Sequence, residues 1–394
     1  LMRLGIKSAL KTILFIAGIL LVLLSYMPDI INNEKLYDNL RIINYVLFGS
    51  LILLAINVKE IVSSRIISFY TVILYIFLTE TLIFLFLDLD KPFSDLIEIT
   101  LPFSAIVIGY SLNYTRRVYH FILLFFCMTA LIIGVVSVFE YVGSFTIMDK
   151  YSTEHKNALG ALLANYATII LCLAHMEEAG KFRKLTYYFV FVLFCACILV
   201  LRSRAAFVAL IFVILLVLWL DIKTNRYKYL IIAGLFAGLI LMFLFRILIL
   251  PEFLYDFFFG GKDLSDLNAI SSGRIERNVA AIKLIADYPL FGQLETTAYL
   301  RTVHNYVLFK VSQFGLIGSL PILLLYFYIA WIIIKNVVRI KQPGLEASGY
   351  IIMVIPFIIS IFEPSYPFGP GSVQIIAFLM FGYSLKKTYL KAKA

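Results

Sequence analysis

Five arginines and one histidine have the types and spacing that best suit chemistry in this sequence. They form three pairs along the chain: Arg202 and Arg204, Arg274 and Arg277, and Arg301 and His304. A guanidinium group binds two phosphate oxygens at once and keeps its charge where water is excluded. A neutral imidazole can accept a proton near pH 7. The pattern therefore predicts a site for a phosphate-bearing anion and leaves open whether the histidine is a base or a polar cap.

Each pair also has an ordinary explanation. The first pair lies between two apolar runs and could anchor a helix end at a membrane surface. The second pair lies in a polar stretch and could form solvated ion pairs with Glu276, Asp287 or Glu295. His304 stands where a helix is expected to begin and could serve as a polar cap. Position in the sequence alone leaves these alternatives open.

The elements that must hold these residues are apolar. Hydrophobic residues make up 62% of the 394-residue chain and charged residues 15%, with a mean hydropathy of +0.95. A soluble chain of this length needs more charge to cover its surface. The apolar residues fall in long blocks, which predicts an all-α polytopic membrane protein of about 12 transmembrane helices.

The blocks predict spans at 8–28, 40–57, 66–87, 98–113, 118–139, 158–176, 185–201, 205–221, 228–250, 304–334, 347–362 and 372–388. The first block lacks a small-residue cleavage site and is expected to stay as a helix. The predicted organisation is therefore an N-terminal membrane region (1–250), a large helical extracytoplasmic loop (251–303) and a C-terminal membrane region (304–394). The span at 304–334 exceeds one bilayer crossing, so its first turns are expected to project from the membrane.

Charge gives the orientation. Counting along the predicted spans puts 20 of the 34 Lys and Arg residues on the side of the two termini, with 5 acidic residues, and 18 acidic residues on the other side. Lys and Arg are enriched in cytoplasmic loops, so both termini are predicted to be cytoplasmic and the 251–303 loop to face outward. The net charge of +10 is then explained by Lys and Arg on the cytoplasmic side of the membrane, and it does not indicate binding of nucleic acid.

Other reactive groups are few. All four cysteines (Cys127, Cys172, Cys195 and Cys197) lie in apolar segments and are expected to be neutral buried thiols. Glu80 lies within the third span, where an ionisable residue is a functional candidate or a structural partner. No metal-ligand cluster is found in the sequence, so no metal site is predicted.

Four stretches, taken together, resemble the superfamily of O-antigen polymerases and O-antigen ligases over about residues 150 to 320. The first runs from His155 through Asn157 to Gly160 and is similar to the family's Asn-x-x-Gly element. The others are Arg202-Ser203-Arg204-Ala205-Ala206, then Ser272-Gly273-Arg274 with Pro289-Leu290-Phe291-Gly292, and finally His304-Asn305 with Gly315-Leu316-Ile317-Gly318. They stand in the family's order and on the expected side of the membrane.

The resemblance implies a GT-C-like fold in the bacterial inner membrane and transfer of glycans carried on undecaprenyl diphosphate. It implies that His304 is the general base and that Arg274 and Arg204 hold the diphosphate. Arg202, Arg277, Arg301, Asn305 and Asn157 are the implied substrate-binding residues. If arginines neutralise the diphosphate, no metal or other cofactor is expected; the bilayer and a chain-length regulator are the other candidate partners.

Three functions fit these residues. A polymerase would pass the growing glycan to the next lipid-linked repeat unit, for O-antigen, capsule or exopolysaccharide. A ligase would pass the finished glycan to lipid A-core, or to a protein in the related oligosaccharyltransferases. A transporter would only bind the lipid diphosphate, but it should place ionisable groups along the midplane, which here holds Glu80 alone. The loop is a divergent version of the signature, which favours the polymerase.

Overall fold

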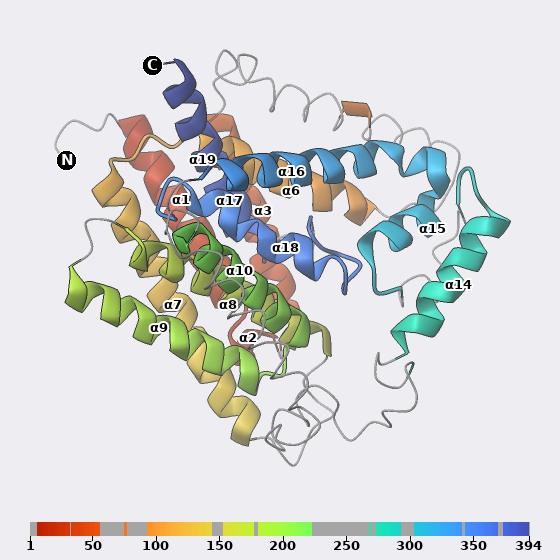
Figure 1. The fold of residues 1–394 in the computed structure, drawn as a ribbon, viewed down its shortest axis with the longest axis horizontal. Coiled ribbons are helices and arrows are strands. Elements are labelled where there is room, and N and C mark those ends of the chain that lie inside the picture. The colour runs from red at the N-terminus through yellow and green to blue at the C-terminus, as the bar shows by residue number, and fades with distance from the viewer. Residues whose placement is uncertain are drawn as a thin grey trace.

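The protein is a bundle of helices (Figure 1). The computed structural model describes residues 6–31, 33–55, 75–76, 93–143, 153–176, 180–222, 268, 273–292, 303–340, 343–368 and 373–393. Within these residues every regular element is helical. The all-α prediction is therefore confirmed for this part of the chain.

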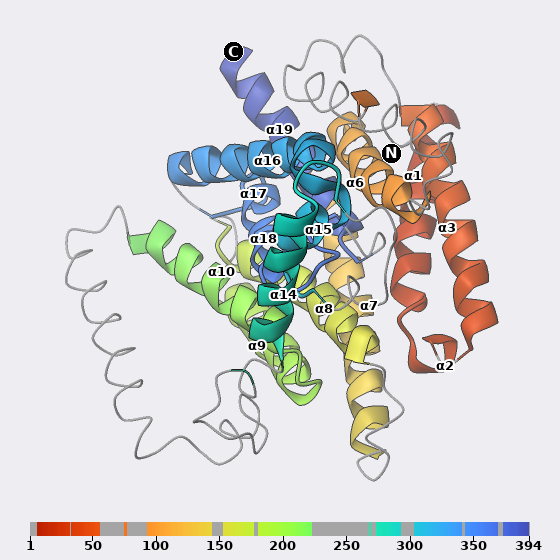
Figure 2. The same cartoon turned by 90° about the vertical axis from the view of Figure 1, so that its right-hand side faces the viewer.

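The first half of the described chain supplies α1 (Ile6–Leu24), α2 (Pro28–Ile31), α3 (Glu34–Ala55), α6 (Phe93–Ser111), α7 (Arg116–Gly143), α8 (Thr153–Ala174), α9 (Lys181–Val200) and α10 (Arg204–Ile222). The second half supplies α14 (Arg274–Asp287), α15 (Tyr306–Gly318), α16 (Leu320–Arg339), α17 (Ser348–Ile352), α18 (Val354–Ile359) and α19 (Ile375–Lys393). The start of α1 and the end of α19 lie at the same end of the bundle (Figures 1 and 2).

Helix α8 is the centre of the bundle. It packs against α7, α9, α10, α17 and α18, and nearly all of its side chains are buried. Its sequence explains this position, because small residues alternate with Leu and Ile on every face and let neighbouring helices approach. Helix α19 packs against α6 and α17 on another side of the bundle. The rigid centre is thus the helix that begins with the Asn-x-x-Gly element.

Five described segments are long and apolar enough to cross a membrane: Arg116–Glu140, Lys156–Ala174, Lys181–Val200, Arg204–Asp221 and Leu320–Arg339. Shorter apolar helices accompany them at Ala9–Leu24, Thr100–Ser111, Tyr306–Gly318 and Ser348–Ile359. The chain is therefore a multi-pass membrane protein. The predicted span 228–250, all of the span 66–87 except residues 75–76, and the candidate Glu80 lie outside the described residues.

The prediction of one long helix over 304–334 was wrong. The segment forms two helices, α15 and α16, that meet at Ser319, and α15 is itself kinked at Gly315. Gly315 has φ 70° and ψ −179°, a backbone conformation that is almost restricted to glycine. An apolar run continues through this point, so hydropathy alone gives no sign of the break.

The prediction of buried thiols is confirmed for three of the four cysteines. All four are free, three are buried and Cys195 is half-buried.

Candidate functional site

The junction between α9 and α10 positions the first arginine pair. Helix α9 ends in a Schellman arrangement, in which the Ser203 N–H donates to the Ile198 carbonyl at 3.3 Å and the Arg202 N–H donates to the Leu199 carbonyl at 3.0 Å. Arg202 takes the left-handed position, with φ 54°, where glycine is usual. Helix α10 then begins directly at Arg204. A tight helix ending therefore fixes both arginines within one turn of chain.

The same junction lies against the start of α8. Any side chain at Gly160 would overlap the Cβ and Oγ atoms of Ser203, which is fully buried. The Lys156 ammonium is close enough to Arg204 and Arg202 for electrostatic repulsion between the charges. The Asn-x-x-Gly and Ser-Arg-Ala stretches, about 45 residues apart, thus form one surface because the glycine leaves room for the serine.

Glu363 is the centre of the candidate site, and sequence reasoning missed it. Its Oε1 accepts hydrogen bonds from Asn157 Nδ2 at 3.1 Å and from Arg274 Nη2 at 3.2 Å. Its Oε2 lies 3.7 Å from His304 Nδ1. The carboxylate is 13% exposed and follows the last turn of α18. It therefore joins α8, α14 and the short segment before α15 that carries His304.

The contact with Glu363 bears on the alternative of ion pairs with Glu276, Asp287 or Glu295, of which Glu295 lies outside the described residues. Arg274 pairs with this carboxylate, 89 positions away, and not with Glu276, which contacts Asn268. In the sequence, Glu363 was only one of many acidic residues on its predicted side. The sequence feature that could have identified it is the apolar stretch Ile361-Phe362-Glu363-Pro364, because a lone acidic residue in such a stretch needs a partner.

His304 is not a helix cap. Asn305 is the N-cap of α15, and its side chain accepts a hydrogen bond from the Leu308 N–H at 3.0 Å. The expectation that α15 begins early enough to include His304 was therefore wrong. The imidazole Nε2 lies 2.9 Å from Arg277 Nη1, and Nδ1 is buried without a hydrogen bond. The second arginine pair and the histidine thus belong to one cluster.

Asn305 has a structural position here. Besides capping α15, its Nδ2 donates to the Ile361 carbonyl at 3.3 Å, and the Tyr306 N–H donates to the Ser360 carbonyl at 3.0 Å. These bonds fix His304 relative to the segment that carries Glu363. Arg301 lies outside the described residues, so its predicted role stays a prediction.

Helix α14 is tied to α15 by a short stretch of paired backbone. The N–H groups of Leu316 and Ile317 donate to the carbonyls of Pro289 and Leu290 at 2.8 and 3.0 Å. This pairing needs a glycine at position 315, because φ is positive there and a side chain would overlap Leu290. The Pro-Leu-x-Gly and Gly-Leu-Ile-Gly stretches are therefore two halves of one contact, which lies at the side of the bundle (Figures 1 and 2).

Positive charge exceeds negative charge at the site. The Arg204 guanidinium lies close enough to Arg274 for the two charges to repel each other. Glu363 is the carboxylate that contacts this cluster among the residues described. Buried Tyr366, three residues further on, has a pKa raised first by burial and then by this carboxylate. Such an excess of cations suits an anion with more than one charge.

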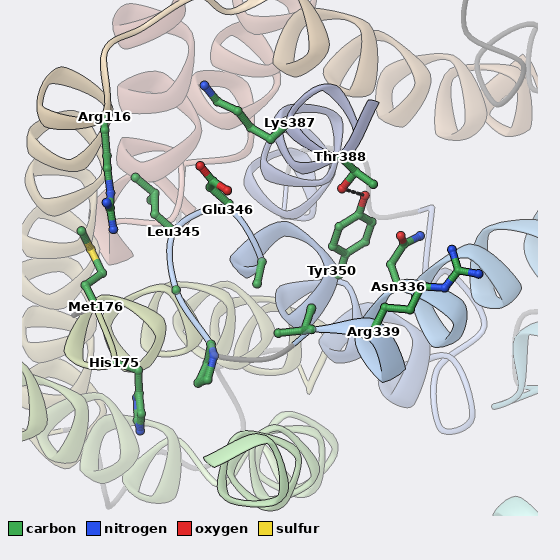
Figure 3. Close-up of a pocket in the computed structure, with 14 residues that line it drawn as sticks. Arg116, His175, Met176, Asn336, Arg339, Leu345, Glu346, Tyr350, Lys387 and Thr388 are labelled. Atoms are coloured by element: carbon green, nitrogen blue, oxygen red, sulfur yellow. Dashed lines mark hydrogen bonds between the residues drawn. The ribbon is translucent and has the colours of Figure 1, made fainter. Parts of the chain in front are cut away.

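The structure also holds a separate cavity of ≈ 530 Å³ (Figure 3). It is lined by residues such as Arg116, His175, Arg339 and Lys387. His175 follows the end of α8, about 27 Å of helix from Asn157 near its start. Arg339 and Lys387 point in different directions (Figure 3), so they do not form a joint anion site. None of the predicted site residues lines this cavity.

With the geometry in place, the family comparison identifies the region that holds most of it. Residues 189–323 match the family model of the O-antigen ligases. This region therefore resembles the O-antigen ligases. It begins within α9 and ends within α16, and it confirms the resemblance to the O-antigen polymerase and ligase superfamily. Among curated proteins, none matches the chain.

The matched region contains the arginine pairs and His304, but the site extends beyond it. Asn157 precedes the matched region and Glu363 follows it. Groups from α8 and from the segment after α18 therefore complete the cluster.

Within the described residues, no group of three or more His, Cys, Asp and Glu side chains is placed to hold a metal ion.

Proposed function

We propose that this protein transfers a glycan from undecaprenyl diphosphate to an acceptor sugar, and that it is a polymerase of lipid-linked repeat units. The observation that carries the proposal is the cluster of Arg204, Arg274, Arg277 and His304. Three separate stretches of the region that matches the O-antigen ligase family contribute to it. An attacking hydroxyl needs a base, and a departing diphosphate needs cations, and the cluster supplies both.

The chemistry proceeds as follows. The acceptor hydroxyl oxygen attacks the anomeric carbon of the lipid-linked glycan, and its proton passes to His304. The bond between the anomeric carbon and the diphosphate oxygen breaks, and the diphosphate leaves with the electron pair. Arg204 and Arg274 stabilise the charge that grows on it, because preorganised cations are strongest in a site with little water. Arg202, Arg277 and Arg301 supply further positive charge, and Asn157 aligns the site.

The direct test uses the His304→Ala and Arg274→Ala variants in a strain that lacks the native gene. Both should lose polymer on a polysaccharide gel while inserting at wild-type levels, since a general base alone contributes about 100- to 10,000-fold in rate. His120→Ala is the matched control, because His120 contacts Tyr187 on a different pair of helices. Wild-type polymer from both site variants would refute the proposal.

The second candidate function is ligation of a finished glycan to lipid A-core. It is favoured by the family match, whose description is O-antigen ligase. The same deletion strain separates the two. Core with a single repeat unit indicates a lost polymerase, whereas bare core with accumulated lipid-linked polymer indicates a lost ligase.

A further inference from the structure

The contacts of His304 define where its proton sits. Arg277 Nη1 lies 2.9 Å from His304 Nε2, and a guanidinium group can only donate hydrogen bonds. The Nε2 atom is therefore the acceptor, and the neutral ring carries its proton on Nδ1. That N–H faces Glu363 Oε2 at 3.7 Å, slightly too far for a hydrogen bond.

In this arrangement His304 cannot act as a base. The Nε2 lone pair that would accept the proton of an acceptor hydroxyl is occupied by Arg277. On the other side of the ring, Glu363 is drawn toward Arg274 and Asn157, both of which donate to its Oε1. The two groups that define the state of His304 are thus both controlled by arginines of α14.

The two arginines can be displaced together. They stand three residues apart on one face of α14, and the Arg277 guanidinium lies over Gly273 at the N-terminus of this helix. A diphosphate carries several negative charges and accepts bidentate hydrogen bonds, so it competes with one carboxylate and one imidazole for both guanidiniums. The positive end of the helix dipole adds to this attraction.

We infer that Glu363 is a positioning residue for His304, and that a bound lipid diphosphate switches it into that role. The diphosphate takes Arg277 from His304 and Arg274 from Glu363. The lone pair on Nε2 is then exposed to the acceptor hydroxyl. Glu363 loses its cationic partner, moves by about 1 Å to reach hydrogen-bond distance, and accepts the Nδ1 proton of His304. It thereby holds the ring and stabilises the imidazolium that forms during transfer.

The inference rests on the proposed function, because it assumes that His304 is the base and that the anion is a lipid diphosphate. It adds an order of events. The donor must bind before the base is uncovered, so an acceptor that arrives first finds no free base.

The test compares Glu363→Gln with wild type, using farnesyl diphosphate as the binding probe. Glutamine keeps the size of the side chain but removes the charge that holds Arg274. Farnesyl diphosphate should bind about tenfold more tightly, the equivalent of about 1.4 kcal/mol. The kcat for glycan transfer should fall by about 100-fold, the lower end of a general base's contribution. Glu276→Gln, at an exposed acid on α14 that contacts Asn268, should change neither value.

The opposite directions of the two effects are decisive. A merely structural role for Glu363 would weaken probe binding and transfer together, and that result would overturn the inference. Wild-type values for both would also overturn it. If Glu363→Gln does not insert, Glu363→Asp decides: it keeps the charge but shortens the reach, so kcat should fall while probe affinity stays near wild type. Unchanged kcat in Glu363→Asp would refute the inference.

A spectroscopic measurement adds an independent readout. The chain has four histidines, so ¹⁵N-labelling of histidine gives few signals. The His304 signals should report a proton on Nδ1 in the free protein and a hydrogen-bonded Nδ1–H after farnesyl diphosphate is added. No change on addition of the probe would contradict the switch.

The proposed function can fail separately from this inference. Full activity of His304→Ala would show that His304 is not the base, and the proposed function would fail. If His304→Ala loses activity while Glu363→Gln behaves like wild type, His304 remains the proposed base. Only the switch through Glu363 is then rejected.

Discussion

Replacing Gly315 by alanine should disconnect the two halves of the site. Gly315 has φ 70° and ψ −179°, and any side chain there would overlap the backbone of Leu290. The substitution therefore forces the chain out of the conformation that pairs Leu316 with Pro289 and Ile317 with Leu290. Helix α14, with its two arginines, would no longer be held beside the histidine that precedes α15.

The size of the effect follows from the contacts. Holding a residue other than glycine in this conformation costs about 1 to 3 kcal/mol. Losing the two backbone hydrogen bonds costs about 0.5 to 1.5 kcal/mol each. The sum is about 2 to 6 kcal/mol, and each 1.4 kcal/mol is tenfold in an equilibrium, so the paired arrangement should become at least about 30-fold rarer. Transfer activity should fall by a similar factor.

Two measurements check this prediction. The first is polymer formed per inserted protein, with Gly49→Ala as control, since a Cβ at Gly49 meets nothing within 4 Å. The second is disulfide cross-linking of Leu290→Cys with Ile317→Cys, in a background without native cysteines. Both positions are exposed, at 53% and 51%, and their backbones are paired. Full activity and undiminished cross-linking in Gly315→Ala would refute the reasoning.

Two further predictions concern the arginine junction and the orientation. In Gly160→Ala the new methyl group should overlap Ser203 and displace Arg204, so transfer should fall by at least about tenfold, the equivalent of about 1.4 kcal/mol. Adding Ser203→Gly should partly restore polymer on the same gel. A fully active Gly160→Ala would contradict this contact. A membrane-impermeant maleimide added to intact cells should label Ile275→Cys, on an exposed position of α14, but not Glu346→Cys, at the other end of the bundle. The reverse labelling pattern would invert the predicted orientation.

Several features could be predicted from the sequence because they depend on local composition. A bilayer requires long apolar helices, and these appear in the residue order without any knowledge of packing. The described helices α7, α8, α9 and α10 begin within five residues of the predicted starts. Arg204, Arg274 and His304 could be selected because their side-chain types suit a diphosphate and a proton transfer.

The tertiary structure alone decided how these residues meet. Glu363 gathers Asn157 from 206 positions earlier and Arg274 from 89 positions earlier, and no local pattern encodes such distances. The break at Gly315 was equally hidden, because apolarity continues across it while the backbone angle depends on Leu290. Sequence thus determined which side chains are available, and packing determined that Arg274 pairs with a carboxylate and that Arg277 covers His304. The physical reason is that hydrophobicity is a property of each residue, whereas an ion pair or a glycine turn is a property of two segments brought together.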